Sequence, residues 1–435
     1  MNVYTKRQRI AKIAKQHRRE PLTLLHHYID KAWLYEAFGE LCKRSAPGVD
    51  AETVTDYAKD LDANLESLLN RAKSGLYKAP PVRRVEIPKP GSQEKRPIGI
   101  PTTEDKVLQK AVQMVLEPVY ELEFYPFSFG FRPKKSCHQA LEYTWKAIMD
   151  NNIQWILDVD IRKFFDTVKH EKLRQLLSIR VRDGVITRLI GKWLKAGVLQ
   201  DGSIRYSDEG TPQGGIISPL LSNIYLHEVL DKWYAEAVRP RLKRRSFMVR
   251  YADDAILGFE SREDAVEVLR VLKNRLLRFG LELHPEKTRL IYFGKPQSNG
   301  EKPSMRGSFD FLGFTHFWAK SLRGYWAVRR KTASKKLREK LKNLNEWCSK
   351  NRGLPLSLQH EKLCQKLKGH YAYYGITGNA RSLGIYLFYL RRTWKKWLNR
   401  RSWRGHKLTW ERFAEMIEHS FPLPPPKIVH SIFKT

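Results

Sequence analysis

The 435 residues include 42% hydrophobic side chains, which is too many for a disordered chain, and the length suggests two or three domains. Lys and Arg number 80 against 46 Asp and Glu, and the net charge of +34 implies a polyanionic partner, first nucleic acid and second a membrane surface. The sequence holds no apolar run of about 18 residues that would span a bilayer, and its four cysteines lack the spacing of zinc ribbons or redox pairs.

The first hundred residues combine a basic segment with a predicted hairpin. Residues 1–20 carry seven Lys or Arg against one acid, and they fit either a solvated helix or, as we expect, an arm on a phosphate backbone. Leucines at helical spacing predict a helix within residues 51–73. Residues 82–101 contain two strand-like runs around a Pro-Gly turn, with Lys89 and Arg96 on the two arms. These cations suit a grip on phosphates, although an ordinary exposed hairpin has the same pattern.

A buried helix and an aromatic loop are predicted next. Residues 102–105 have capping-box character, and the helix that they start is expected to end at Pro118. Residues 128–133, Ser-Phe-Gly-Phe-Arg-Pro, predict a compact loop. Its rings suit either simple packing or stacking on single-stranded bases.

Two acids lie on one face of the following predicted strand. Side chains alternate in residues 153–161, so Asp158 and Asp160 share one face while apolar side chains share the core-facing side. A glycine-rich loop, residues 209–215, then precedes a helix that starts at residue 218. Glycines in such a loop let backbone or substrate approach closely.

A second acidic pair lies at the tip of a predicted β-hairpin, residues 247–259. Two apolar runs flank a turn that holds Asp253 and Asp254 side by side. Adjacent carboxylates between apolar strands repel each other, and they stay ionised only beside a cation, most simply a divalent metal. A solvated hairpin tip is the simpler explanation, since Asp is common in turns.

The C-terminal quarter is the most basic part of the chain. Residues 309–314 predict a strand with a glycine at a close approach. Residues 331–435 contain 23 Lys or Arg against 6 Glu, a net charge of +17, which is half of the excess of the whole chain. The segments 335–347 and 391–401 are predicted to be basic helices, which can pack one face and offer the other to phosphates.

Asp160, Asp253 and Asp254 would form one small acidic site if the fold brought them together. Hard carboxylate oxygens select Mg²⁺ over zinc or copper. Two such ions would activate a 3′ hydroxyl and stabilise the leaving pyrophosphate of an in-line phosphoryl transfer. Phe165 would pack under the sugar and leave no room for a 2′-OH. These residues predict templated nucleotide addition.

The motifs resemble those of a known family. Tyr251-Ala252-Asp253-Asp254 resembles the YxDD box of reverse transcriptases, and further blocks occur in the family's order. These blocks are residues 96–101, 128–133, 158–166, 211–219, 284–288 and 311–313. Together they are similar to group II intron-encoded reverse transcriptases, also called maturases. The resemblance covers roughly residues 40–430, in which residues 369–379 and the basic helices after them look like the family's thumb, or X, domain.

The resemblance implies an α+β fold of the right-hand polymerase type, with fingers, an antiparallel-sheet palm and an α-helical thumb. We expect a basic N-terminal extension in residues 1–45, fingers and palm in 46–320 and the thumb in 331–435. It also implies that Asp160, Asp253 and Asp254 hold two Mg²⁺ ions. Spacing alone leaves Asp158 equally placed, but Asp160 lies five residues before Phe165, the family's sugar-gate position.

The family pattern assigns further roles around the nucleotide and the primer. Contacts to the nucleotide are implied for Lys89, Arg96 and Gln213, and protonation of the pyrophosphate for Lys287. The primer grip would be Phe311, Leu312 and Gly313. The implied partners are group II intron RNA or another RNA template, a DNA primer and dNTPs, with no membrane, in a bacterial cytoplasm.

The longest family members also carry a C-terminal DNA-binding region and a His-Asn-His endonuclease. No cluster of metal-spaced His or Cys follows the thumb segment in this sequence. We therefore expect a short, endonuclease-free member that does not nick a target strand and borrows its primer, for example from a replication fork.

Three other functions share part of this pattern. An RNA-binding splicing cofactor with weak or no polymerase activity would use the basic thumb and N-terminal segment, but it has no need for three costly acids. A domesticated group II-like reverse transcriptase in host defence or DNA repair shares the catalytic boxes, and the sequence does not separate it. An acid-triad nuclease or integrase would have dispersed acids without the hairpin pair.

Overall fold

The structure is a computed structural model, and it describes residues 1–88, 95–200, 203–206, 210, 214–296, 307–321, 323–401 and 408–431. Two units make up the chain. The first unit comprises Met1–Tyr143 and Trp155–Leu290, and the second comprises Thr144–Gln154 and Ile291–Thr435. Helices and largely antiparallel sheets make this an α+β protein, which confirms the predicted fold class at that level. No helix in the described ranges is long and apolar enough to cross a membrane.

Two four-stranded sheets organise the first unit. One has the order β2-β1-β4-β5 and consists of β1 (Val82–Pro88), β2 (Lys95–Ile100), β4 (Val198–Gln200) and β5 (Ser203–Arg205). The other has the order β6-β7-β3-β8 and consists of β3 (Trp155–Val159), β6 (Ser246–Tyr251), β7 (Asp254–Phe259) and β8 (Arg289–Tyr292), whose last two residues belong to the second unit. The antiparallel pairs β1–β2 and β6–β7 confirm the two predicted hairpins.

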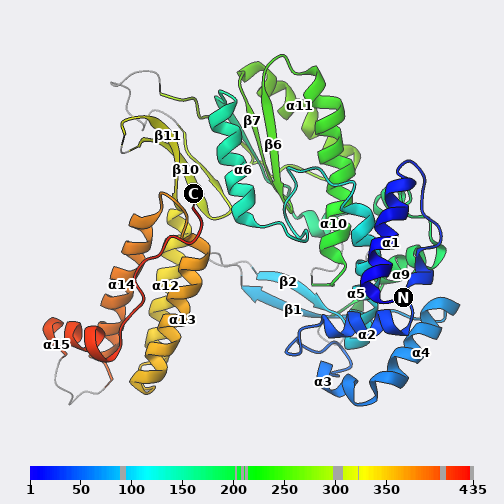
Figure 1. Cartoon of the computed structure of the whole chain (residues 1–435), viewed down its shortest axis with the longest axis horizontal. Helices are drawn as coiled ribbons and strands as arrows, with labels where there is room; N and C mark the ends of the chain where they lie inside the picture. The colour runs from blue at the N-terminus through cyan, green and yellow to red at the C-terminus, as the bar shows by residue number, and fades with distance from the viewer. Residues whose placement is uncertain are drawn as a thin grey trace. The chain divides into compact units, whose positions relative to one another are not determined.

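Helices supply most of the core of the first unit. They are α1 (Val3–Gln16), α2 (Lys31–Gly39), α3 (Val54–Tyr57), α4 (Leu61–Ser74), α5 (Thr103–Tyr120), α7 (Phe164–Thr167), α8 (His170–Leu177), α9 (Gly184–Leu194), α10 (Ser218–Leu226) and α11 (Arg262–Arg278). The helix α6 (Cys137–Asp150) begins in this unit and ends in the second. In Figure 1, α11 runs beside β6 and β7, and its buried Val268 and Leu272 join Leu257 of β7 in one core.

Two local predictions for this unit were wrong. The N-terminal segment is the helix α1 rather than an arm, because Ile10 is buried and Arg7 forms an ion pair with Glu117 of α5. The helix α5 does not end at Pro118 but continues to Tyr120. A proline this close to a helix end removes only one backbone hydrogen bond, and the buried side chains on both sides hold the last turn in the core.

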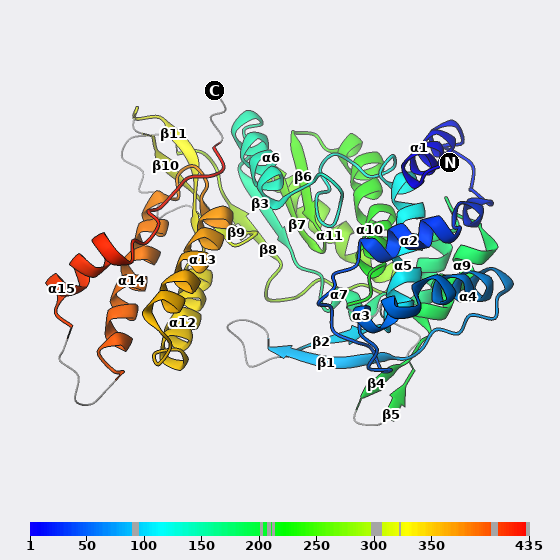
Figure 2. The same cartoon turned by 60° about the horizontal axis from the view of Figure 1, so that its bottom comes forward.

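The second unit combines a small sheet with basic helices. Its strands β9 (Phe309–Phe311), β10 (Phe314–Lys320) and β11 (Trp326–Thr332) pair in the order β11-β10-β9. Its helices are α12 (Ser334–Lys350), α13 (Leu356–Tyr374), α14 (Ala380–Leu398) and α15 (Trp410–Glu415). Figure 2 shows α12, α13 and α14 side by side. Residues 309–314 are therefore two strands and a turn, not the single strand that we predicted.

Two glycines give a matched test of this packing. Gly258 of β7 faces Phe247 of β6, and a Cβ atom at Gly258 would lie 2.0 Å from the buried Phe247 ring. We expect Gly258→Ala to lower the free energy of unfolding by about 1–3 kcal/mol, because the ring has no free space to enter. Gly191 lies inside α9, and a Cβ there meets nothing within 4 Å, so Gly191→Ala should raise the same quantity by about 0.5–1 kcal/mol. Urea unfolding of both variants measures the difference, and equal stabilities would contradict this account of the hairpin.

Candidate active site

The tip of the β6–β7 hairpin carries the acidic pair. Tyr251 pairs with Asp254 across the strands, so Ala252 and Asp253 form a two-residue turn. Ala252 has a backbone φ of 57°, which residues other than glycine rarely adopt. The antiparallel strand β3 lies beside β7 and ends at Val159, so Asp160 follows directly at the same end of the sheet.

The carboxylates at this end of the sheet act on one another. Burial raises the pKa of Asp253 above the usual range, and the charge of Asp160 raises it further. For Asp254, burial among the surrounding protein atoms and the charges of Asp253, Asp160 and Asp158 raise the pKa to about 7, although the residue reaches solvent. The fold therefore places the three acids that the sequence singled out at the same end of one sheet, where their charges act on one another.

Two cations distinguish Asp160 from Asp158. The Lys287 Nζ atom lies 3.4 Å from an Asp160 carboxylate oxygen, and the Arg289 guanidinium lies 3.2 Å from an Asp158 carboxylate oxygen. The backbone N–H of His284 donates to the Asp160 carbonyl over 2.8 Å. The block 284–288 thus fixes the backbone of Asp160 and supplies the cation beside it.

The structure describes two of the four other residues that we predicted to lie around the nucleotide. Arg96 of β2 is near enough to Asp253 for its positive charge to oppose the rise in the pKa of that carboxyl. Phe165 lies half-buried in α7, with its ring centroid 5.3 Å from that of Phe164. Lys89 and Gln213 lie outside the described residues.

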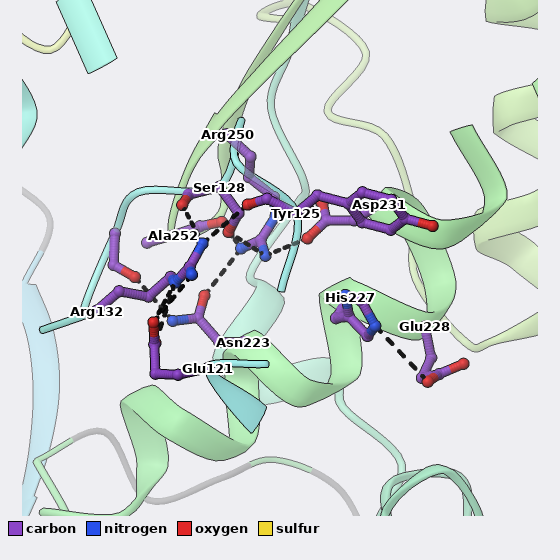
Figure 3. A network of polar contacts seen from close by, with 11 residues as sticks. Glu121, Tyr125, Ser128, Arg132, Asn223, His227, Glu228, Asp231, Arg250 and Ala252 are labelled. Carbon is purple, nitrogen blue, oxygen red and sulfur yellow. Dashed lines mark hydrogen bonds and ion pairs between the residues drawn. The ribbon is translucent and has the colours of Figure 1, made fainter. Parts of the chain in front are cut away.

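A buried network that the sequence analysis missed holds the acidic turn (Figure 3). Arg250 of β6 is fully buried and forms two hydrogen bonds of 2.7 and 2.6 Å with the carboxylate of Asp231. It also donates to the Asn223 side chain, the Ser128 hydroxyl and the Ala252 carbonyl, at 2.9, 2.7 and 2.9 Å. A fully buried arginine in a strand requires a buried acid. An arginine in the apolar run directly before Tyr251 was therefore the sequence signal that could have predicted this network.

The aromatic loop at residues 128–133 supports the same turn. Phe129 donates its backbone N–H to the Arg250 carbonyl over 2.9 Å, and a Cβ at Gly130 would lie 2.2 Å from the Ala252 nitrogen. Arg132 is buried and paired with Glu121. Of the two alternatives for this loop, packing is therefore the one that the structure favours, with Phe131 as the exposed ring.

The predicted primer grip belongs to the second unit. Phe311 ends β9, and Leu312 and Gly313 form the turn to β10 with φ values of 50° and 79°. The Tyr373 hydroxyl donates to the Leu312 carbonyl over 2.9 Å. The turn is thus fixed within its own unit, and its role remains a prediction.

The chemistry of the donor set suits a hard cation. Asp160, Asp253 and Asp254 offer only carboxylate oxygens, which are the ligands that Mg²⁺ prefers. Among the residues that the structure describes, no three His, Cys, Asp or Glu side chains converge closely enough to hold a metal ion as they stand. Burial and the neighbouring carboxylates raise the pKa of Asp254, and a bound cation would oppose this rise.

Comparisons with known proteins give the family. The family model described as reverse transcriptase (RNA-dependent DNA polymerase) matches residues 87–316. The chain belongs to the reverse transcriptase family. Reverse transcriptases generally use a divalent metal ion.

The relatives of this reverse transcriptase are largely intron proteins. It is 37% identical over 230 residues to the group II intron-encoded protein LtrA of Lactococcus lactis subsp. cremoris, and the matched segment covers 52% of this chain and 37% of LtrA. It is 33% identical over 323 residues to protein YkfC of Escherichia coli (strain K12), and this match covers 67% of this chain and 81% of YkfC. It is 38% identical over 184 residues, 42% of this chain and 22% of the relative, to an uncharacterized 91 kDa protein in the cob intron of Schizosaccharomyces pombe. These likenesses support the group II intron branch, while the chain spans little more than a third of the length of LtrA.

The Arg250–Asp231 pair can be tested separately from the fold. Arg250→Met leaves Asp231 buried without a counter-charge, so we expect the free energy of unfolding to fall by about 3–5 kcal/mol. The double variant Arg250→Met/Asp231→Leu removes both charges and should regain most of this loss. Primer extension by the double variant should stay impaired, because the Ala252 carbonyl has lost its donor. Recovery of activity together with stability would show that the pair serves the fold alone.

The raised pKa of Asp254 predicts a pH-dependent stability. Between about pH 4 and 7 the native state binds more protons than the unfolded state, so stability falls as the pH rises through this window. Asp254→Asn lacks this titration. In the presence of EDTA, the melting temperature of the unsubstituted protein should fall relative to that of Asp254→Asn between pH 5 and 8. Added Mg²⁺ at pH 8 should narrow the difference, whereas parallel curves would contradict the acidic cluster.

Proposed function

We propose that this chain is an RNA-directed DNA polymerase encoded by a group II intron, which copies RNA into DNA and binds intron RNA to assist splicing and mobility. The single observation that carries the proposal is the assembly of Asp160, Asp253 and Asp254 at one end of a sheet in a member of the reverse transcriptase family. The architecture would be a right hand, with fingers and palm in residues 46–320, a helical thumb in 331–435 and the basic extension in 1–45.

The proposed chemistry uses the acids and the cations beside them. When bound by the three carboxylates, two Mg²⁺ ions would supply charge neutralisation at the reacting phosphate and activate the 3′ hydroxyl. Arg96, whose charge already acts on Asp253, would hold the triphosphate together with Lys89. Lys287, which lies beside Asp160, would give a proton to the leaving pyrophosphate.

Selection and alignment of the substrates would fall to other residues. Phe165 would lie under the sugar and exclude a 2′-OH, and Gln213 would lie beside the incoming nucleotide. The turn Phe311-Leu312-Gly313 would hold the primer end. The described backbone contacts that fix Asp160 and Ala252 support this proposal, because nucleotide addition requires a rigid arrangement of the reacting groups.

Primer extension tests the proposed function directly. On an RNA template with Mg²⁺ and dNTPs, Asp254→Asn should reduce synthesis about a thousandfold or more, because a metal ligand supplies several kcal/mol of transition-state stabilisation. The affinity of the same variant for RNA should stay within about twofold, since phosphate contacts lie elsewhere. Tight RNA binding without synthesis by either protein would overturn the polymerase and favour a splicing cofactor.

Asp158 provides a matched control for Asp160. Both carboxylates lie near Asp254 and each pairs with one cation, so Asp158→Asn and Asp160→Asn remove the same charge from nearly the same place. We expect Asp160→Asn to abolish primer extension and Asp158→Asn to keep it within about tenfold, as only the former removes a metal ligand. Equal losses would mean that the summed negative charge, not the identity of the ligand, matters.

A further inference from the structure

A groove between α8 and α9 lies outside the residues assigned to the polymerase site. Two adjoining cavities of about 800 and 620 Å³ form it, and both are lined by Arg174, Thr187, Gly191 and Lys195. Gly191 leaves the floor open, since a Cβ atom there would meet nothing within 4 Å. We call these two cavities together the α8–α9 groove.

The charged side chains that line the α8–α9 groove are almost all cations. The basic lining residues are Lys78, Lys169, Arg174, Arg182, Arg188, Lys192 and Lys195. Within the described lining, Glu171 is the one acid, and it accepts a hydrogen bond from Gln175. Lys192 and Arg188 are fixed by hydrogen bonds to backbone carbonyls. The exposed side chains of Arg174 and Lys195 make no hydrogen bond or ion pair with any described residue, so they are available to an anionic ligand.

A buried polar atom without a partner and an exposed ring complete the lining. His170 is only 6% exposed, and its Nε2 atom bonds to the Gly210 carbonyl while its Nδ1 atom has no partner among the described residues. Tyr206 lines the smaller cavity and is 75% exposed. An unpaired buried polar atom in a cavity lining points to a polar ligand, and an exposed ring beside cations offers a stacking surface.

We propose that the α8–α9 groove is a second RNA-binding site, which holds a single-stranded segment with its phosphates at Arg174 and Lys195 and a base on Tyr206. The cations alone would also suit an acidic peptide. The exposed ring at the edge of the groove favours RNA, because every base has a face that stacks on an aromatic side chain. Gly210 links the groove to Phe165. Its carbonyl accepts a hydrogen bond from His170 in the groove lining, and a Cβ at Gly210 would lie 3.2 Å from the Phe165 carbonyl oxygen.

Salt-dependent RNA binding tests the phosphate contacts. The probe is a fluorescein-labelled 20-residue oligouridine, and affinity is measured between 50 and 300 mM salt. For single strands the slope of log affinity against log salt changes by about 0.7 for each phosphate contact, so Arg174→Ala/Lys195→Ala should reduce it by about 1.4. The matched control Lys273→Ala/Arg278→Ala removes two exposed cations of α11 and should leave the slope unchanged. Equal slopes for the groove variant and the control would overturn the proposal.

Two further pairs of variants test binding in the groove without changing the charge of the protein. Gly191→Trp fills the groove without changing charge and should weaken binding, whereas Gly191→Ala should not. Tyr206→Ala should weaken binding about fivefold or more with an unchanged slope, and Tyr206→Phe should preserve it, because stacking and not charge is lost. Melting temperatures confirm that each variant is folded.

Photo-crosslinking locates the RNA independently of these affinities. A 4-thiouridine version of the probe should crosslink to the peptide that contains Tyr206, and this crosslink should disappear in Arg174→Ala/Lys195→Ala. Crosslinks confined to other peptides would overturn the proposal. So would a groove variant that loses affinity for a polyglutamate peptide and keeps its affinity for oligouridine, since the partner would then be an acidic protein.

Discussion

Arg250 lies at 0% exposure in the core of the first unit, and all five of its N–H donors are used. Two go to Asp231, and the others go to Asn223, Ser128 and the Ala252 carbonyl. A buried arginine is tolerated only when an acid and further acceptors satisfy its charge and its N–H groups. The partners of Arg250 must therefore keep their positions around the guanidinium. The network therefore ties a helix, a loop and a strand to the turn that presents Asp253 and Asp254.

Two unusual features of the backbone lie in this network. Ala252 adopts a φ of 57°, and such a conformation persists only where the surroundings over-determine it. The hydrogen bond from Arg250 and the close approach of Gly130 provide that determination. Asp231 lies in the π-helical segment η3 (His227–Asp231), a widened type of turn that is frequent at functional sites.

The acidic site is a local exception in a chain of net charge +34. Lys287 and Arg289 balance Asp160 and Asp158, but the pKa of Asp254 still rises to about 7. Burial and the crowding of carboxylates cause this rise, and both favour the binding of a cation at this end of the sheet. Elsewhere the positive charge stays at the surface because amphipathic helices separate it from the core. Trp394, for example, is fully buried and donates to Gln359, while the nearby Lys396 lies exposed.

The sequence by itself determined the hairpin at residues 247–259 and the acids at its tip, because these depend on neighbours within one element. It did not determine the path of the chain through Pro118 or the helix at the N-terminus, where partners such as Glu117 decide the outcome. Nor did it separate Asp158 from Asp160, because alternation puts both on one face, and only the structure shows that Asp160 lies beside Lys287 and Asp158 beside Arg289. The Arg250 network and the α8–α9 groove were likewise settled by the tertiary structure, because their members are many residues apart and spacing carries no record of distant contacts.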